Sequence, residues 1–134
     1  MMLHTPHSPD DHTATNRQVM LDFARVMYEQ RDPAKAFALY VSPDYVQHNP
    51  MLPDGRDAAV AFLAPLYGAP ESTFEVQRML VDGDLVALHV RAHPAGRPLL
   101  AVADFYRLVD GLIVEHWDAI QPVPQESAND HPMF

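Results

Sequence analysis

The sequence predicts an α+β domain in which N-terminal helices precede an antiparallel sheet. Apolar residues recur at helical spacing up to about residue 68 and alternate with polar residues from residue 72 onward. Two Asp-Gly dipeptides, at residues 82–83 and 110–111, favour tight hairpins between the alternating segments. Helices that precede strands in this way are typical of the α+β class.

Three helices are expected, each with its own start signal. Thr15 and Gln18 form a capping-box pattern, so the first helix is expected to begin at Thr15. Asp32 and Pro33 suit the N-cap and the first position of a second helix. After a short extended piece, YVQHNP, a third helix is expected to open at residues 54–55.

Four strands are expected after the helices, at residues 73–81, 84–92, 98–109 and 112–121. The turn signals connect them into an antiparallel meander, in which each strand pairs with the next one along the chain. A twisted sheet of this size can curl round the helices and leave a pocket between sheet and helices. The inward faces of the strands are therefore the expected walls of a binding site.

The chain is expected to form one domain with short flanking ends. Its 134 residues suffice for a single core, which is assigned to residues 15–128, with a flexible arm at 1–14 and a tail at 129–134. No apolar run could span a membrane and no segment resembles a signal peptide, which predicts a cytoplasmic location. The net charge of −9 argues against nucleic acid or an anionic membrane as a partner.

The last expected strand carries two ionisable residues where apolar ones are expected. Alternation along VEHWDAIQ places His116 and Asp118 on the same face as Val114 and Ile120. A buried carboxylate is costly unless it has a hydrogen-bond partner or a raised pKa, and such groups gather at functional sites. His116 and Asp118 are therefore predicted to form either a catalytic pair or a structural pair.

Further polar residues are predicted to line the pocket: Asp104, Tyr106, His89, Tyr45, His48 and Asn49. Asp104 and Tyr106 share a face of the expected strand at residues 98–109, and His89 interrupts the apolar strand at residues 84–92. The other three residues belong to YVQHNP. Each also has an ordinary structural explanation, as a hydrogen-bonded core side chain or as part of a turn.

The sequence lacks the motifs that are typical of several other kinds of enzyme. The chain has no cysteine, no glycine-rich phosphate loop and no Gly-x-Ser-x-Gly nucleophile motif. A metal site built from His48, His89, His116 and Asp104 remains a third hypothesis, since these are zinc-type ligands. The favoured prediction nevertheless involves no metal and no organic cofactor.

Two segments resemble the SnoaL-like polyketide cyclases of the nuclear transport factor two-like superfamily. They are YVQHNPMLPDG after the helices and VADFYRLVDGLIVEHWDAIQPVP near the end, and with the element order the resemblance covers roughly residues 15–128. The resemblance implies a cone-like barrel, in which a curved antiparallel sheet wraps the helices and encloses an apolar pocket. It also implies a homodimer formed through the sheet.

The resemblance further implies an activity. Cyclases of this family close a ring by intramolecular aldol condensation without metal or cofactor, using an Asp of the last strands as general acid/base and a pocket His as its assistant. On this chain those roles fall on Asp118 and His116, and Asp104, at a polar position whose role varies across the superfamily, is the third predicted catalytic residue. We therefore expect a small enzyme that performs acid/base chemistry on an apolar carbonyl compound. The alternatives are a non-catalytic protein that binds a small molecule in the same pocket and the metal-dependent enzyme.

Overall fold

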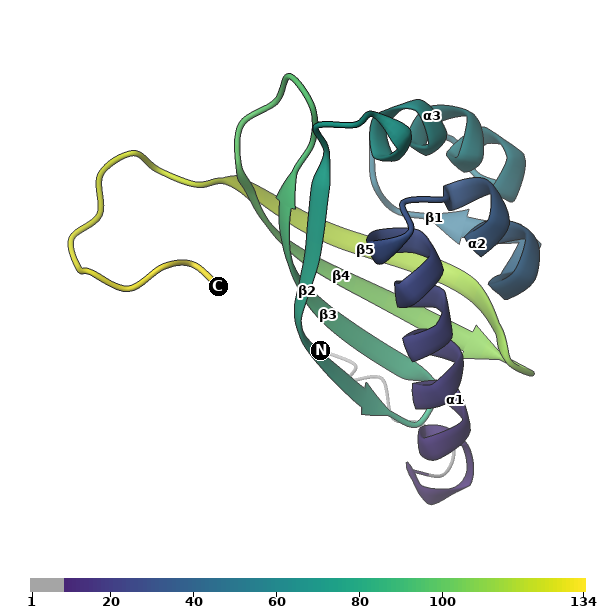
Figure 1. Cartoon of the computed structure of the whole chain (residues 1–134). Helices are drawn as coiled ribbons and strands as arrows, with labels where there is room; N and C mark the ends of the chain where they lie inside the picture. The colour runs from purple at the N-terminus through teal and green to yellow at the C-terminus, as the bar shows by residue number, and fades with distance from the viewer. Residues whose placement is uncertain (1–8) are drawn as a thin grey trace.

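The computed structural model describes residues 9–134, in which helices cover one face of a five-stranded sheet (Figure 1). The helical segments are α1 (Pro9–Ala24), a π-helical turn η1 (Arg25–Glu29) that continues it, α2 (Pro33–Tyr40) and α3 (Arg56–Gly68). The strands are β1 (Val41–Gln47), β2 (Thr73–Asp82), β3 (Leu85–His93), β4 (Leu100–Val109) and β5 (Leu112–Pro122). The predicted α+β class and the order of helices before the meander are therefore confirmed.

The sheet has the order β1-β5-β4-β3-β2, which adds one strand to the predicted meander. The four later strands pair antiparallel with their chain neighbours, as predicted. The prediction of four strands is wrong, because the start of the predicted extended piece YVQHNP belongs to a fifth strand, β1, which pairs parallel with β5. Strand β1 begins at Val41, before that piece, and contains Pro43. Proline interrupts a central strand but is tolerated here, because β1 is at the edge of the sheet.

The predicted start of the first helix is also wrong. Helix α1 already begins at Pro9, and Thr15 lies inside it instead of capping it. Proline is well suited to a helix start, because its missing N–H would have no partner there. Residues 9–14, predicted to belong to a flexible arm, are therefore helical, and residues 1–8 of that arm lie outside the described residues.

The first turns of α1 are held by the hairpin between β2 and β3. The hydroxyl of Thr13 accepts a hydrogen bond from the backbone N–H of Gly83 at 2.9 Å, and the side-chain amide of Asn16 donates to the Gly83 carbonyl at 2.9 Å. The second helix starts as predicted, with the Asp32 carboxylate accepting from the backbone N–H of Lys35 at 3.1 Å.

The hydrophobic core lies between the helices and the sheet, and Phe23 of α1 is fully buried within it. Its ring lies 5.5 to 6.3 Å, between centroids, from four other aromatic rings: Tyr28, Phe37, Tyr40 and Tyr106. No helix in the described part of the chain is long and apolar enough to cross a membrane.

A β-bulge near the β4–β5 hairpin changes which residues of β5 face the helices. Leu108 pairs with Ile113 and Arg107 pairs with Glu115, which leaves Val114 as an extra residue. Ile113 consequently lines the cavity described below, whereas Val114 does not. The predicted inward position of Val114 is wrong for this reason, because simple alternation assumes a strand without a bulge.

Candidate functional site

A cavity of about 160 Å³ lies between the sheet and the helices. Side chains of η1, α2 and α3 form one side of it, and the inner face of the sheet forms the other. The lining is predominantly apolar and aromatic, and its polar groups are concentrated where β4, β5 and the end of β1 meet. A concave, mostly apolar space with a few convergent polar groups is the usual form of a small-molecule site.

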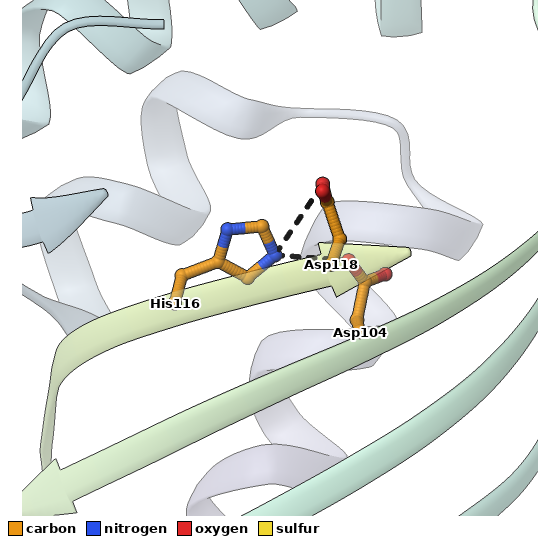
Figure 2. A group of neighbouring side chains, drawn as sticks. All are labelled: Asp104, His116 and Asp118. Atoms are coloured by element: carbon orange, nitrogen blue, oxygen red, sulfur yellow. Dashed lines mark hydrogen bonds and ion pairs between the residues drawn. The ribbon is translucent and has the colours of Figure 1, made fainter. Parts of the chain in front are cut away.

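Two carboxylates and one imidazole meet at this wall, and we call Asp104, His116 and Asp118 the Asp-His-Asp cluster (Figure 2). The pairing of β4 with β5 sets Asp104 directly opposite Asp118. Nε2 of His116 lies 2.9 Å from Oδ1 of Asp104 and 4.0 Å from Oδ2 of Asp118. All three side chains are at most 12% exposed. The structure thus brings together the three residues that strand alternation predicts on one face.

Two tyrosine hydroxyls support Asp104 from the side of the helices. The hydroxyl of Tyr28 donates to Oδ2 of Asp104 at 3.1 Å and lies 2.7 Å from the hydroxyl of Tyr106. Because Tyr28 has a single hydroxyl proton, Tyr106 must be the donor to Tyr28. Burial first, and the charge of Asp104 second, raise the pKa of both hydroxyls well above the ordinary value, so both remain donors.

Tyr28 is a site residue that the sequence does not reveal. It stands in a helical apolar stripe, where an aromatic residue has an ordinary role in the core. The structure places it on the π-helical turn η1, and turns of this kind occur frequently at functional sites. Tyr106, which is predicted to line the pocket, does so.

Asn49 and Asp118 form a second pair at the same wall. The side-chain amide of Asn49 donates to Oδ2 of Asp118 at 2.8 Å. Burial raises the pKa of Asp118, the Asn49 hydrogen bond and the positive charge of His116 lower it, and the charge of Asp104 raises it. The net effect is a raised pKa, as predicted for a carboxyl group in an apolar pocket.

Gln47 links these groups, although it is absent from the predicted site. Its Oε1 accepts from the backbone N–H of Asn49 at 2.9 Å and lies 2.8 Å from Nδ1 of His116. Its side-chain amide donates to the hydroxyl of Tyr45 at 2.7 Å. The signal that could have identified Gln47 is alternation, because Tyr45, Gln47 and Asn49 are spaced two apart and all three line the cavity.

The predicted contact of His48 with the pocket is wrong. The same alternation directs His48 to the outer face of the sheet, where its ring stacks on Trp117 at 4.9 Å with an interplanar angle of 7°. Its Nε2 lies 2.7 Å from the carboxylate of Glu115, which Arg107 contacts at 2.9 Å. Burial raises the pKa of Glu115, but the hydrogen bonds from His48 and Arg107 outweigh this effect and hold the pKa below its usual value.

The predicted contact of His89 with the pocket is wrong as well. The buried residues of β3 are Val86, Leu88, Val90 and Ala92, so His89 is on the opposite face of the strand. Its Nδ1 contacts the guanidinium of Arg78, and its ring lies near the ring of Phe134.

The metal hypothesis loses two of its four predicted ligands, because His48 and His89 lie outside the cavity. Within the described residues, the Asp-His-Asp cluster is the group that could hold an ion, with ligand atoms all within 4.8 Å of one another. Nε2 of His116 is at hydrogen-bond distance from Asp104, so an ion would have to replace the proton between these two groups.

Tyr67 of α3 presents an unused hydroxyl to the cavity. Its ring stacks on Phe74 at 3.8 Å with an interplanar angle of 1°, and its hydroxyl has no hydrogen-bond partner among the described residues. Burial first, and then the charges of Asp104 and Asp118, raise its pKa, so the hydroxyl keeps its proton. That proton is available to a bound molecule.

Comparison with known proteins relates the chain to one family and one fold. The SnoaL-like domain family matches residues 20–116. An NTF2-like protein of unknown function from Mesorhizobium loti superposes with a TM-score of 0.72 and 25% identity, covering 88% of this chain and 99% of that one.

Two further solved structures share the fold. A candidate ketosteroid isomerase from Kribbella flavida superposes with a TM-score of 0.69 and 20% identity, covering 88% of this chain and 86% of that one. A candidate SnoaL-like polyketide cyclase from Jannaschia sp. CCS1 has a TM-score of 0.65 and 20% identity, over 85% and 90%. No curated protein sequence matches the chain.

Proposed function

Because the chain belongs to the SnoaL-like domain family and has the NTF2-like fold, we propose that it is a small enzyme that performs general acid/base chemistry on an apolar carbonyl compound. The proposal requires no metal and no organic cofactor. The observation that carries it is the Asp-His-Asp cluster at the wall of an apolar cavity. The names of two structural neighbours, ketosteroid isomerase and polyketide cyclase, agree with this class, although their likeness to the chain is one of fold.

Asp118 is the proposed general base. A carboxylate with a raised pKa in an apolar site is a stronger base than one in water, so it can take a proton from the carbon next to a carbonyl group. The electron pair of the broken C–H bond moves onto the carbonyl oxygen, which gives an enolate. In a condensation, the enolate carbon then attacks a second carbonyl group, and the new alkoxide receives a proton from the site.

Two groups of the site can stabilise the negative oxygen. The hydroxyl of Tyr67 is unpaired among the described residues, and the amide of Asn49 has a second N–H besides the one directed at Asp118. The proton shared by His116 and Asp104 is the proposed acid. Nε2 of His116 lies 4.0 Å from Oδ2 of Asp118, so this acid is next to the proposed base. The cavity is thus lined by the proposed base, the proposed acid and donors for the oxygen.

The size of the cavity limits the substrate. A cavity of about 150 Å³ is large enough to hold benzene. The cavity of about 160 Å³ therefore has room for a compound of about one ring. We propose a small carbonyl compound as the occupant.

Deuterium exchange tests the proposed function even though the natural substrate is not identified. One-ring ketones that raise the melting temperature (Tm) of the protein would be incubated with it in D2O, and deuterium at the carbon next to the carbonyl group would be followed by mass spectrometry. Acceleration of exchange is the expected result. Ketones that bind without exchange would favour the alternative, a non-catalytic binding protein with the same pocket.

The change Tyr67→Phe is expected to slow this exchange by roughly a hundredfold, the usual scale for one lost donor to a developing oxyanion. The Tm should change little, because the hydroxyl has no partner to lose among the described residues. Tyr40→Phe is the matched control, since Tyr40 does not line the cavity. Equal rates in both variants would remove Tyr67 from the mechanism.

We also propose that the protein is a homodimer formed through the outer face of the sheet. The register places four apolar residues in one continuous row across β2, β3, β4 and β5: Leu80, Ala87, Phe105 and Trp117. Leu80 is 67% and Phe105 42% exposed, which is high for large apolar side chains on a sheet. A second copy that covers this row would remove it from water.

Sedimentation at micromolar concentration is expected to show a species of twice the 15.0 kDa chain mass. Phe105→Glu should convert it to the monomer, because a carboxylate in an apolar interface is poorly solvated. Leu39→Glu, at a residue that is 53% exposed on α2, is the control and should leave the dimer intact. A species of 15.0 kDa alone in the unmodified protein would contradict the proposal.

A further inference from the structure

The orientation of the Gln47 side-chain amide is fixed by a neighbouring backbone N–H group, which can donate a hydrogen bond but cannot accept one. The backbone N–H of Asn49 lies 2.9 Å from Oε1 of Gln47, and a backbone N–H can only donate. If the amide were rotated by half a turn, its NH2 group would face this N–H, and both partners would be donors. The carbonyl oxygen of Gln47 must therefore be the atom that faces Nδ1 of His116 at 2.8 Å.

This orientation decides the protonation of one ring nitrogen of His116. An amide oxygen has no hydrogen to donate, so a hydrogen bond to it requires a proton on Nδ1. On the other side of the ring, Nε2 faces the carboxylate of Asp104 at 2.9 Å. Both nitrogens thus face acceptors, and both contacts are satisfied when the ring carries two protons, or when Asp104 carries the proton between them.

We propose that Gln47 is a positioning residue that keeps a proton on Nδ1 of His116, so that only Nε2 exchanges a proton with Asp104 and Asp118. The catalytic meaning of this arrangement rests on the proposed function. Without an acceptor at Nδ1, a neutral ring with its one proton on Nε2 would satisfy Asp104, and the cluster would hold one proton fewer. The amide of Gln47 therefore maintains the acid that returns a proton to the product.

The frame around Gln47 is rigid enough for this role. Its backbone N–H donates to the carboxylate of Asp54 at 2.8 Å, and its residue position is in register with His116 across the β1–β5 pairing. Its side-chain NH2 group donates to the hydroxyl of Tyr45 at 2.7 Å. Turning the amide would place this NH2 group against the backbone N–H of Asn49 and would lose that hydrogen bond.

Nitrogen NMR of the imidazole rings tests the inference directly and needs no substrate. In uniformly 15N-labelled protein at neutral pH, Nδ1 of His116 is expected to have the chemical shift of a protonated ring nitrogen. The His116 signals are assigned by their loss in His116→Gln. In Gln47→Met, which has a similar length and no acceptor, the Nδ1 signal is expected to move to the position of an unprotonated nitrogen, with the proton on Nε2.

Two further variants make the test specific. Gln47→Glu retains an acceptor oxygen and should retain the protonated Nδ1 signal, so that it reports on the hydrogen bond even if Gln47→Met is poorly folded. Gln121→Met, an exposed residue of the same strand as His116, is the matched control and should leave the His116 signals unchanged.

The inference is overturned if Nδ1 is unprotonated in the unmodified protein, or if it stays protonated in a folded Gln47→Met. These outcomes are independent of the deuterium exchange assay. A protonated Nδ1 that depends on Gln47, in a protein that exchanges no ketone protons, would overturn the proposed function and leave this inference standing.

Discussion

Replacing Asp118 by Asn is expected to reduce ketone proton exchange by roughly a hundredfold to ten-thousandfold, the range for loss of a general acid or base. The change removes the charge and the proton acceptor but keeps the shape of the side chain. The carbonyl oxygen of the new amide can still accept the hydrogen bond that Asn49 now donates to Oδ2 at 2.8 Å. The local structure should therefore survive, and the loss of rate would be chemical.

The same variant has a pH signature in stability. The folded-state pKa of Asp118 is raised above its unfolded value. Its contribution to stability is therefore fully present below the unfolded pKa, at about pH 4, and is lost as the pH rises through the folded pKa. An Asn at this position never ionises. Relative to the unmodified protein, Asp118→Asn should gain stability as the pH is raised from about 4 to about 7.

Melting curves at several pH values, together with the exchange rate, distinguish catalysis from structure. If Asp118 serves only as a hydrogen-bonded structural group, its replacement should destabilise the fold by about 1 to 3 kcal/mol and leave the exchange rate unchanged. That result would rule out the proposed base. Asp110→Asn, in the β4–β5 turn outside the cavity, is a control for the loss of one carboxylate.

The second large effect is expected at Phe23, whose replacement by Ala should destabilise the fold by about 3 to 5 kcal/mol. The side chain is fully buried and contacts four aromatic rings, two of which belong to the site residues Tyr28 and Tyr106. Truncation would leave a void that the neighbouring rings cannot close without moving. Chemical denaturation would give the change directly, and the Tm should fall by roughly 10 °C or more.

Leu21→Ala is the control on the same helix, because Leu21 is 48% exposed and loses little contact on truncation. Leu21→Ala should lower the free energy of unfolding by much less than Phe23→Ala does. A loss of less than about 1 kcal/mol in Phe23→Ala would mean that the aromatic cluster relaxes freely, which would contradict a tightly packed wall behind the site.

The sequence pattern predicts the meander and places charged residues on its inner face. Alternation is a reliable guide to the faces of a strand whose neighbours are regular, which is why Asp104, His116 and Asp118 were identified. The parallel pairing of β1 with β5 is not predicted, because it depends on contacts between segments that are distant in the chain. The bulge at Val114 is not predicted, because simple alternation assumes a regular strand.

The predicted site is wrong where the sequence pattern does not decide which face of a strand is buried. His89 interrupts a strand that is apolar on both faces, and His48 stands between inward residues of YVQHNP. Both lie on the outer face of the sheet. Gln47 stands at the correct position of the same alternating segment but is chemically less conspicuous. Tyr28 was missed because its hydroxyl acquires its role only when α1 and η1 pack against β4.

The pairing of the first strand with the last has a consequence for biosynthesis. Asn49 and Asp118 are separated by 69 positions in the chain, and the hydrogen bond between them needs both β1 and β5 in place. Contacts of such long range form late, because the loop between them must close first. While the chain is still on the ribosome, the β2–β3 hairpin can already form, but Asn49 and the proposed base Asp118 are not yet together. The proposed site is therefore incomplete until β5 has emerged.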